Sequence, residues 1–486
     1  MNFSMIRYIL GWVLVFEGGF LLLPSITSVI YNEKEGTVYL AVAAISVALG
    51  FLLTHIKKPD IKNIFAKEGF AVVSLSWVLL SMVGAVPMYL TGEIPSYVNA
   101  LFETISGFTT TGSSILSDVE VLSKTTSFWR LFTHWVGGMG FLVFIMAILP
   151  LAGGSTMHLM KAESPGPQVG KFVPRAKKTA LILYEIYIFI TVLETITLII
   201  VGLKPFDALT LTFATVGTGG FGLLNSSIAS YSMAVQIVIT LFMIISSINF
   251  SVYYLFLIRK PKEALKFEEM INYLAMVFIA AGLITANLVH GGFYNHVGKA
   301  FQQAIFQVAS VTSTTGFCTT DFNTWPSFSK TILFLLMFVG ACAGSTGGGF
   351  KVSRLAIFVK NIKCDILSVI HPRSVIKVRY NGKQITDKML YKILCYLAIY
   401  VMVIIVSVLL VSIDGKDMET NISAVMATFN NIGPGFGQVG ASSNFDSYGV
   451  FAKFVLMFDM LIGRLELYPI LIIFLPEIWM IRKKNK

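Results

Sequence analysis

Thr109-Thr110-Thr111-Gly112 is the first of four short polar stretches that end in glycine and recur at nearly regular intervals along the chain. The other three are Val216-Gly217-Thr218-Gly219, Ser313-Thr314-Thr315-Gly316 and Asn430-Asn431-Ile432-Gly433. Each stretch follows a short amphipathic run and leads, after a polar segment, into a long apolar run. Self-similarity at a nearly fixed period is typical of proteins built from structural repeats. We therefore interpret the chain as four copies of one unit.

The repeated stretches have the chemistry of a cation filter. Four such turns around one axis would form a ring of backbone carbonyl oxygens, which replaces the hydration shell of K⁺. Glycine permits a positive φ, so that carbonyls can turn inward, and the neighbouring threonines add hydroxyl oxygens. One such stretch alone is more often a helix kink or a packing contact, whereas four in register indicate a pore. The predicted filter residues are Thr110, Thr111, Gly112, Gly217, Thr218, Gly219, Thr314, Thr315, Gly316, Asn431, Ile432 and Gly433.

The second unit leaves two registers open. Matching the four units to each other aligns Gly219 with Gly112, Gly316 and Gly433. However, the run from Thr215 to Gly219 also resembles the TVGYG loop of K⁺ channels, which favours Gly217. Both glycines are therefore predicted as candidates.

The composition is that of a polytopic membrane protein. Hydrophobic residues make up 55% of the 486 residues and charged residues 13%, whereas soluble domains carry about 25% charged residues. The apolar runs reach about 20 residues, the length that crosses a bilayer. The net charge of +11 comes from basic residues clustered in a few loops, which argues against a nucleic-acid partner and for a surrounding membrane lipid.

We predict an all-α fold of four pseudo-symmetric helix, pore-loop, helix units around a central pore, preceded by a retained N-terminal helix pair. The short segments before each glycine turn are too short to span a membrane and suit re-entrant helices buried by protein. The predicted boundaries are 1–68 for the helix pair and 69–177, 178–267, 268–387 and 388–486 for the units. The predicted re-entrant helices are 96–108, 206–214, 298–311 and 417–430.

Charge predicts the orientation of ten spanning segments. Basic residues cluster after each unit and at the end of the chain, while the opposite loops carry acidic residues such as Glu93, Asp118 and Asp446. Since positive loops face the cytoplasm, both termini are predicted to be cytoplasmic. The basic loop at 359–387 has no nucleotide-binding fingerprint, so a regulatory nucleotide would need another subunit.

Two further features lie within the apolar helices. The glycine-rich stretch from Gly340 to Gly349 should unwind, because glycine costs a helix about 1 kcal/mol per position; close helix packing is the alternative interpretation. Arg464 lies inside the last apolar segment, where a charge is costly and marks a functional site; pairing with Asp459 or Glu466 is the alternative. The predicted gate residues are Gly344, Ser345, Thr346, Gly347, Gly348, Gly349, Lys351 and Arg464.

Over its whole length the chain resembles the Trk/Ktr/HKT superfamily of K⁺ transporters, and within it the TrkH-type membrane subunits. The resemblance rests on the four filter stretches, the glycine-rich stretch and the segment Gly463-Arg464-Leu465-Glu466. It implies an intramembrane gate below the filter and, since Gly112 is not serine, a preference for K⁺. It also implies a homodimer in a bacterial plasma membrane with a cytosolic nucleotide-binding regulatory subunit of the NAD or ATP type.

The sequence thus predicts K⁺ uptake driven by the ion gradient, with K⁺ as the bound ion and no organic cofactor. Sodium or mixed Na⁺/K⁺ conduction stays open because the fourth stretch, Asn430 to Gly433, departs from the others. An ion-conducting subunit of a pump is a second alternative. Inverted repeats are disfavoured because all units run in the same direction. No catalytic cluster is evident, so we do not expect an enzyme.

Overall fold

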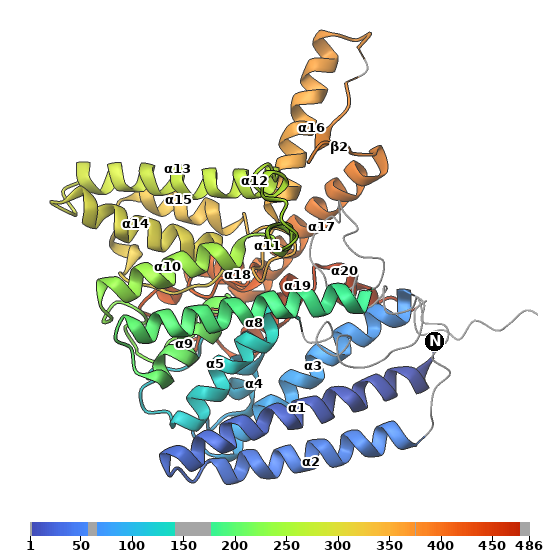
Figure 1. Cartoon of the computed structure of the whole chain (residues 1–486), viewed down its shortest axis with the longest axis vertical. Helices are drawn as coiled ribbons and strands as arrows, with labels where there is room; N and C mark the ends of the chain where they lie inside the picture. Colours follow the sequence, from blue (N-terminus) through green and yellow to red (C-terminus); the bar gives the residue numbers. More distant parts are fainter. Residues whose placement is uncertain (1, 57–65, 141–175, 375, 477–486) are drawn as a thin grey trace, which may run out of the picture.

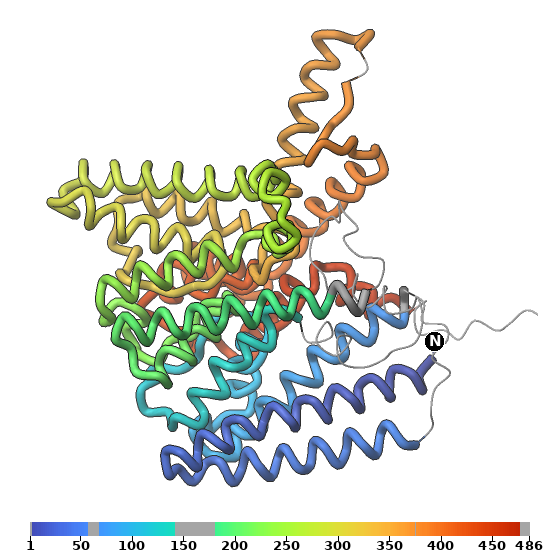
Figure 2. The backbone as a smooth tube through the Cα atoms, viewed as in Figure 1, coloured from blue at the N-terminus to red at the C-terminus, as the bar shows by residue number. Residues whose placement is uncertain are grey.

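The computed structural model describes residues 2–56, 66–140, 176–374 and 376–476. The regular secondary structure of this part of the chain is helical, apart from an isolated bridge between Val339 and Phe350 and one small antiparallel hairpin, in which β1 (Arg379–Tyr380) pairs with β2 (Lys383–Gln384). The long helices run side by side in one bundle, and α16 and the hairpin project from it at the top of the view (Figure 1). The N-terminus lies at the opposite end of the bundle from the turns that join α1 to α2 and α13 to α14 (Figures 1 and 2).

The predicted N-terminal helix pair is confirmed. Helices α1 (Phe3–Tyr31) and α2 (Gly36–His55) pack tightly on each other, and α1 also contacts α3 and α5. Small residues allow the close approach: a methyl group on Gly11 would lie 2.9 Å from the carbonyl oxygen of Gly50. Such contacts are the usual means of helix association in membranes.

Each of the four units begins with a long outer helix followed by a short pore helix, as predicted. The outer helices are α3 (Ala66–Leu90), α8 (Ala176–Ile200), α13 (Glu268–His290) and α17 (Asp387–Val411). The pore helices are α4 (Tyr97–Phe108), α9 (Pro205–Val216), α14 (Val297–Thr312) and α18 (Met418–Phe429). The last residues of each pore helix are buried, so the turns that follow lie within the protein.

The inner helices that follow the turns are short. They and their continuations are α5 (Lys124–Gly138), α10 (Met233–Ser247) with α11 (Phe250–Leu257), α15 (Ser327–Met337) with α16 (Val352–Ile370), and α19 (Val450–Arg464) with α20 (Tyr468–Ile473). Connecting turns are α12 (Pro261–Leu265), η1 (Phe322–Thr324), η2 (Ser412–Asp414) and η3 (Gly437–Val439).

Our sequence analysis placed an interruption only in the third inner helix, and this was wrong for the second and fourth. Helices α10 and α11 meet at an angle of 88°. Helix α19 stops at Arg464, and Glu466 and Leu467 then take positive φ values of 59° and 64°. The second break is hydrogen-bonded by the glycine-rich stretch of the third unit, as described below, whereas the fourth lies between Gly463 and Pro469. The ends of the first and fourth inner helices, 141–152 and 477–481, lie outside the described residues.

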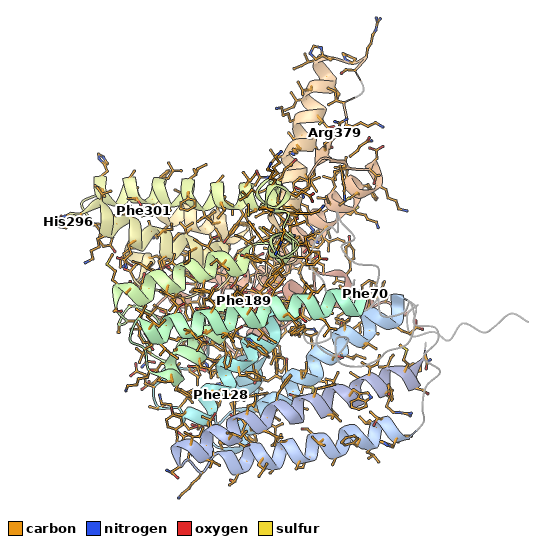
Figure 3. All side chains as sticks on the ribbon, viewed as in Figure 1. Phe70, Phe128, Phe189, His296, Phe301 and Arg379 are labelled. Atoms are coloured by element: carbon orange, nitrogen blue, oxygen red, sulfur yellow. The ribbon has the colours of Figure 1, made fainter. Side chains whose placement is uncertain are left out.

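Within the described ranges, six helices are long and apolar enough to cross a membrane, or seven if the bent pair α10–α11 is one span. The six are α1, α2 and the outer helix of every unit. Their outward faces carry large apolar side chains, such as Phe189 on α8, which is 66% exposed (Figure 3). Such an apolar exterior requires lipid. The chain is therefore a multi-pass membrane protein.

Candidate functional site

The pore helices all end in the same backbone turn. Thr110, Thr218, Thr314 and Asn431 have φ values of 54°, 56°, 57° and 54°. In every unit the next N–H donates to the carbonyl five residues before it, at 2.8–2.9 Å. The four donors are Thr111, Gly219, Thr315 and Ile432. A repeated non-glycine residue at positive φ is uncommon and costs free energy, so the surroundings must hold it there.

These turns correct the register of the second unit. The glycines at the equivalent position are Gly112, Gly220, Gly316 and Gly433, with φ values of 79°, 80°, 88° and 101°. Gly219 therefore matches Thr111, and Gly217 is the helix cap that matches Thr109. Both predicted alternatives, Gly219 and Gly217, were wrong as the structural equivalent. The pair Gly220-Phe221, which recurs as Gly316-Phe317, was the signal that could have set the register.

The four turns close into a ring. If a methyl group were added to the glycine of any turn, it would lie less than 3.0 Å from a carbonyl oxygen of the next turn. That oxygen belongs to the residue that precedes the next turn's glycine. The pairs are Gly112 with Gly219, Gly220 with Thr315, Gly316 with Ile432, and Gly433 with Thr111. Because the fourth turn meets the first, the units surround one axis in chain order. Only glycine fits at these positions.

The same turns place one carbonyl oxygen of each turn next to the glycine of a neighbouring turn. Positive φ occurs before and after the middle residue of each turn, while the middle residue is not left-handed. With four such turns around an axis, the arrangement has the oxygen-rich character of a cation filter.

Buried polar side chains, which our sequence analysis did not include in the site, hold the first and second turns together. Arg130 pairs with Glu103 at 2.5 Å and donates to the carbonyl of Gly222 at 3.1 Å. Its guanidinium also lies 3.6 Å from the ring centre of Phe221. The carboxylate of Glu103 accepts hydrogen bonds from Ser114 at 3.0 and 3.1 Å. A buried arginine and a buried glutamate 27 residues apart, in a chain this apolar, were the available signal.

His134 lies between the same two turns. One ring nitrogen, Nδ1, is 2.8 Å from the carbonyl oxygen of Gly107, and the other, Nε2, accepts from the N–H of Phe221 at 3.3 Å. This pattern requires the neutral ring with its proton on Nδ1. The ring of His134 thus packs directly against the filter.

The glycine-rich stretch is unwound, as predicted, and lies directly under the filter. We call residues 340–349 the gate loop. Gly348 donates its N–H to the hydroxyl of Thr314 at 2.7 Å. A methyl group on Gly347 would lie 2.8 Å from the carbonyl oxygen of Ser313, and one on Gly348 would lie 2.8 Å from that of Asn430. The loop therefore covers the third and fourth turns from below.

Two cations hold the gate loop. Lys351 is buried and donates from Nζ to the carbonyls of Gly347 and Gly348. Arg464 donates to the carbonyl of Thr346 at 2.7 Å and to those of Gly137 and Gly138 at the end of α5. Because the first and third units face each other across the ring, one guanidinium that contacts both lies near the axis.

The carboxylates proposed as alternative partners of Arg464 have other contacts. Asp459 accepts from Ser407 at 2.6 Å, and Glu466 pairs with Arg354. Arg464 and the gate loop line one cavity together with Gly138, Met139 and Gly140. A charged side chain and the gate loop thus occupy the space beneath the ring.

The fold and this site define a class of protein, the pore-loop membrane proteins in which four re-entrant helices surround one axis. Residues 36–285 and 294–481 match the family model TrkH, described as a cation transport protein. The chain belongs to the TrkH family.

Relatives match over nearly the whole chain. The Trk system potassium uptake protein TrkH of Escherichia coli K12 is 33% identical over 484 residues, which cover 99% of this chain and 100% of the relative. TrkG of the same organism is 29% identical over 486 residues, covering 99% and 100%. The crystal structure of the potassium transporter TrkH from Vibrio parahaemolyticus superposes with a TM-score of 0.89 at 30% identity, covering 99% of this chain and 100% of that one.

Proposed function

We propose that the chain is the ion-conducting membrane subunit of a Trk-type K⁺ uptake system. The observation that carries the proposal is the closed ring of four turns, each with glycine at the point of contact. A ring of backbone carbonyls suits K⁺ because it replaces the ion's water oxygens without a fixed charge. The names of the relatives agree with this assignment.

The gate loop and Arg464 regulate this conduction in our proposal. At an effective dielectric constant of about 20, two like charges about 4 Å apart repel by roughly 4 kcal/mol. A guanidinium near the axis therefore opposes passage of K⁺ even if water screens most of that repulsion. The variant Arg464→Ala should raise K⁺ flux without abolishing selectivity, since the filter lies elsewhere.

The cellular setting is also part of the proposal. We infer a bacterial plasma membrane with both termini in the cytoplasm, from the distribution of basic loops. A homodimer and a cytosolic nucleotide-binding subunit are inferred from the family resemblance. Co-purification of the full-length chain with its native membrane partners, followed by mass measurement of the intact complex, tests both.

Sodium conduction is the second candidate function, and one observation favours it. The contact of Gly433 with the carbonyl oxygen of Thr111 is looser than the other three, since a methyl group there would lie 2.8 Å away. A filter that is wider at one corner would discriminate less strictly among cations.

Flux measurement in liposomes decides between the two. The purified protein should carry K⁺ and Rb⁺ much faster than Na⁺ or Li⁺. The variant Gly282→Ala is a suitable control, because Gly282 is on α13 with nothing within 4 Å of an added methyl group. Equal transport of Na⁺ and K⁺ by the wild-type protein would refute the K⁺-selective proposal and support the second.

A further inference from the structure

The break in the second inner helix has a feature that the filter and gate do not by themselves explain. Helix α10 ends at Ser247 and α11 begins at Phe250, with the two axes at 88°. The residues between them, Ile248 and Asn249, have extended ψ values of 144° and 122°. No proline lies in this segment, so the bend needs another cause.

The gate loop occupies the backbone groups that the bend exposes. Ser247 accepts from the N–H of Cys342 at 3.1 Å. Ser246 accepts from the hydroxyl of Thr346 at 3.1 Å. On the other side of the break, Phe250 donates its N–H to the carbonyl of Gly344 at 3.0 Å. The end of α10 and the start of α11 thus bind the gate loop through their free backbone groups.

A continuous helix would need the same groups. In an α-helix each N–H donates to the carbonyl four residues before it, so Phe250 would bond to Ser246 and Ser251 to Ser247. Those bonds would take the single N–H of Phe250 from the gate loop, and the carbonyls of Ser246 and Ser247 would each have to accept a second hydrogen bond to keep the loop in place. The bent helix with a held loop and the straight helix with a released loop are therefore mutually exclusive.

We propose that the α10–α11 break is a two-state switch whose bent form holds the gate loop against the filter and whose straight form releases it. The role in conduction rests on the proposed K⁺ function, whereas the switch itself is a property of the fold. Released, the loop would lose its contacts with Thr314 and Ser313 beneath the ring. The path below the filter would then open.

Asn249 is the positioning residue of the bent form. Its side chain accepts from the N–H of Ser251 at 2.9 Å and so caps α11. Its amide nitrogen is 3.4 Å from the carboxylate of Glu269 on α13. That buried carboxylate also accepts from the N–H of Ala343, inside the gate loop, at 2.7 Å and from the N–H of Ser353, just after the loop, at 3.2 Å. Asn249 therefore links the break, α13 and the loop.

Two substitutions of Asn249 distinguish a helix switch from a simple loosening of the gate loop. Asn249→Ala and Asn249→Pro both remove the cap and the contact with Glu269. Alanine allows the helix to continue, whereas proline blocks it. Proline suits the backbone of the bent form, because Asn249 has a φ of −55° and the residue before it is extended; it also removes the N–H that Asn249 donates to the sulfur of Cys342.

We expect Asn249→Ala to raise K⁺ flux per folded molecule about tenfold, the shift in a two-state equilibrium that loss of one helix cap produces. Asn249→Pro should leave flux at or below the wild-type level. If both variants raise flux equally, the loop is merely loosened and the switch is refuted. If Asn249→Ala leaves flux unchanged or lowers it, the proposal also fails.

A distance measurement tests the switch without any ion flux. Spin labels at Ile237 on α10 and Phe256 on α11, both exposed, would report the angle between the helices in a background without native cysteines. Asn249→Ala should add a population with a longer distance, and Asn249→Pro should not. If Asn249→Ala shows the longer distance but the wild-type protein carries no K⁺, the switch is supported and the proposed function is rejected. An unchanged distance in Asn249→Ala would reject the switch alone.

Discussion

The first and third filter turns differ from the second and fourth in what supports them. In the first turn the hydroxyls of Thr109 and Thr111 lie 2.7 Å apart, and in the third those of Ser313 and Thr315 do the same. Each of these two turns thus has a hydroxyl pair of its own, in addition to a contact from a neighbour, Asn431 at the first turn and Gly348 at the third. The backbone is nevertheless the same in all four.

The second and fourth turns are braced by neighbouring elements. Gly217 and Gly219 have no side chains, and the ring of His134 fills the space beside Gly219. In the fourth turn Asn431 donates to the hydroxyl of Thr111 and to the carbonyl of Met460, both at 2.9 Å. One backbone geometry can therefore be stabilised either from within the turn or from outside it, and sequence identity among the turns is not required.

The largest effect should come from changing the glycine shared by all turns. Serine at Gly112, Gly220 or Gly316 would force a side chain into a neighbouring carbonyl at a strained φ. We expect each variant to lose most of its preference for K⁺ over Na⁺. Gly433→Ser should lose less, because its neighbour is 2.8 Å away. Competition of Na⁺ with Rb⁺ uptake in liposomes measures the order, and equal losses in all four variants would contradict it.

The next largest effect should come from removing the His134 side chain, which supports the second turn from outside. His134→Ala deletes a buried ring and its hydrogen bonds with Gly107 in the first unit and Phe221 in the second, which should cost about 3–5 kcal/mol. The thermal midpoint should fall and Na⁺ should compete better with Rb⁺. The control is His296→Ala, since His296 lies exposed at the turn between α13 and α14 (Figure 3). Unchanged selectivity of folded His134→Ala protein would mean that the second turn does not depend on this ring.

A smaller effect is expected for the brace of the fourth turn. Asn431→Ala loses two hydrogen bonds, together worth about 2 kcal/mol, and releases the hydroxyl of Thr111. Thermal unfolding and Na⁺ competition should both change, but by less than in His134→Ala. Asn444→Ala, at an outer loop, provides the comparison. If Asn431→Ala has an effect as large as that of His134→Ala, the predicted order of the two contacts is wrong.

The smallest effect should follow loss of an internal brace. Thr109→Val keeps the shape of the side chain and removes one hydroxyl pair in the first turn, while Ser313→Ala does the same in the third. Each should cost about 1 kcal/mol and shift selectivity only slightly. Because the two turns are braced alike, the two variants should match within error in thermal unfolding. A large difference between them would end the proposed equivalence of the first and third turns.

The sequence predicted most of the fold. Hydropathy located the N-terminal pair and all four outer helices, and segment length separated the pore helices from the spanning ones. It also found the glycine-rich gate loop and the charged residue below it, Arg464. It failed where two glycines in a row, Gly219 and Gly220, made the spacing ambiguous. It failed also at the α10–α11 break, whose acceptors Ser246 and Ser247 are bonded by a loop about 100 residues later.

By itself the sequence determined properties that depend on residues close together in the chain. These are the length and apolar character of the spanning helices, the positions that need glycine, and the four-fold repetition. The tertiary structure decided the closure of the ring, the braces of each turn and the partners of Arg464, Lys351 and Glu269. The physical reason is that a hydrogen bond between distant segments depends on which of many compatible donors and acceptors the packing brings together. Local propensity does not carry that information.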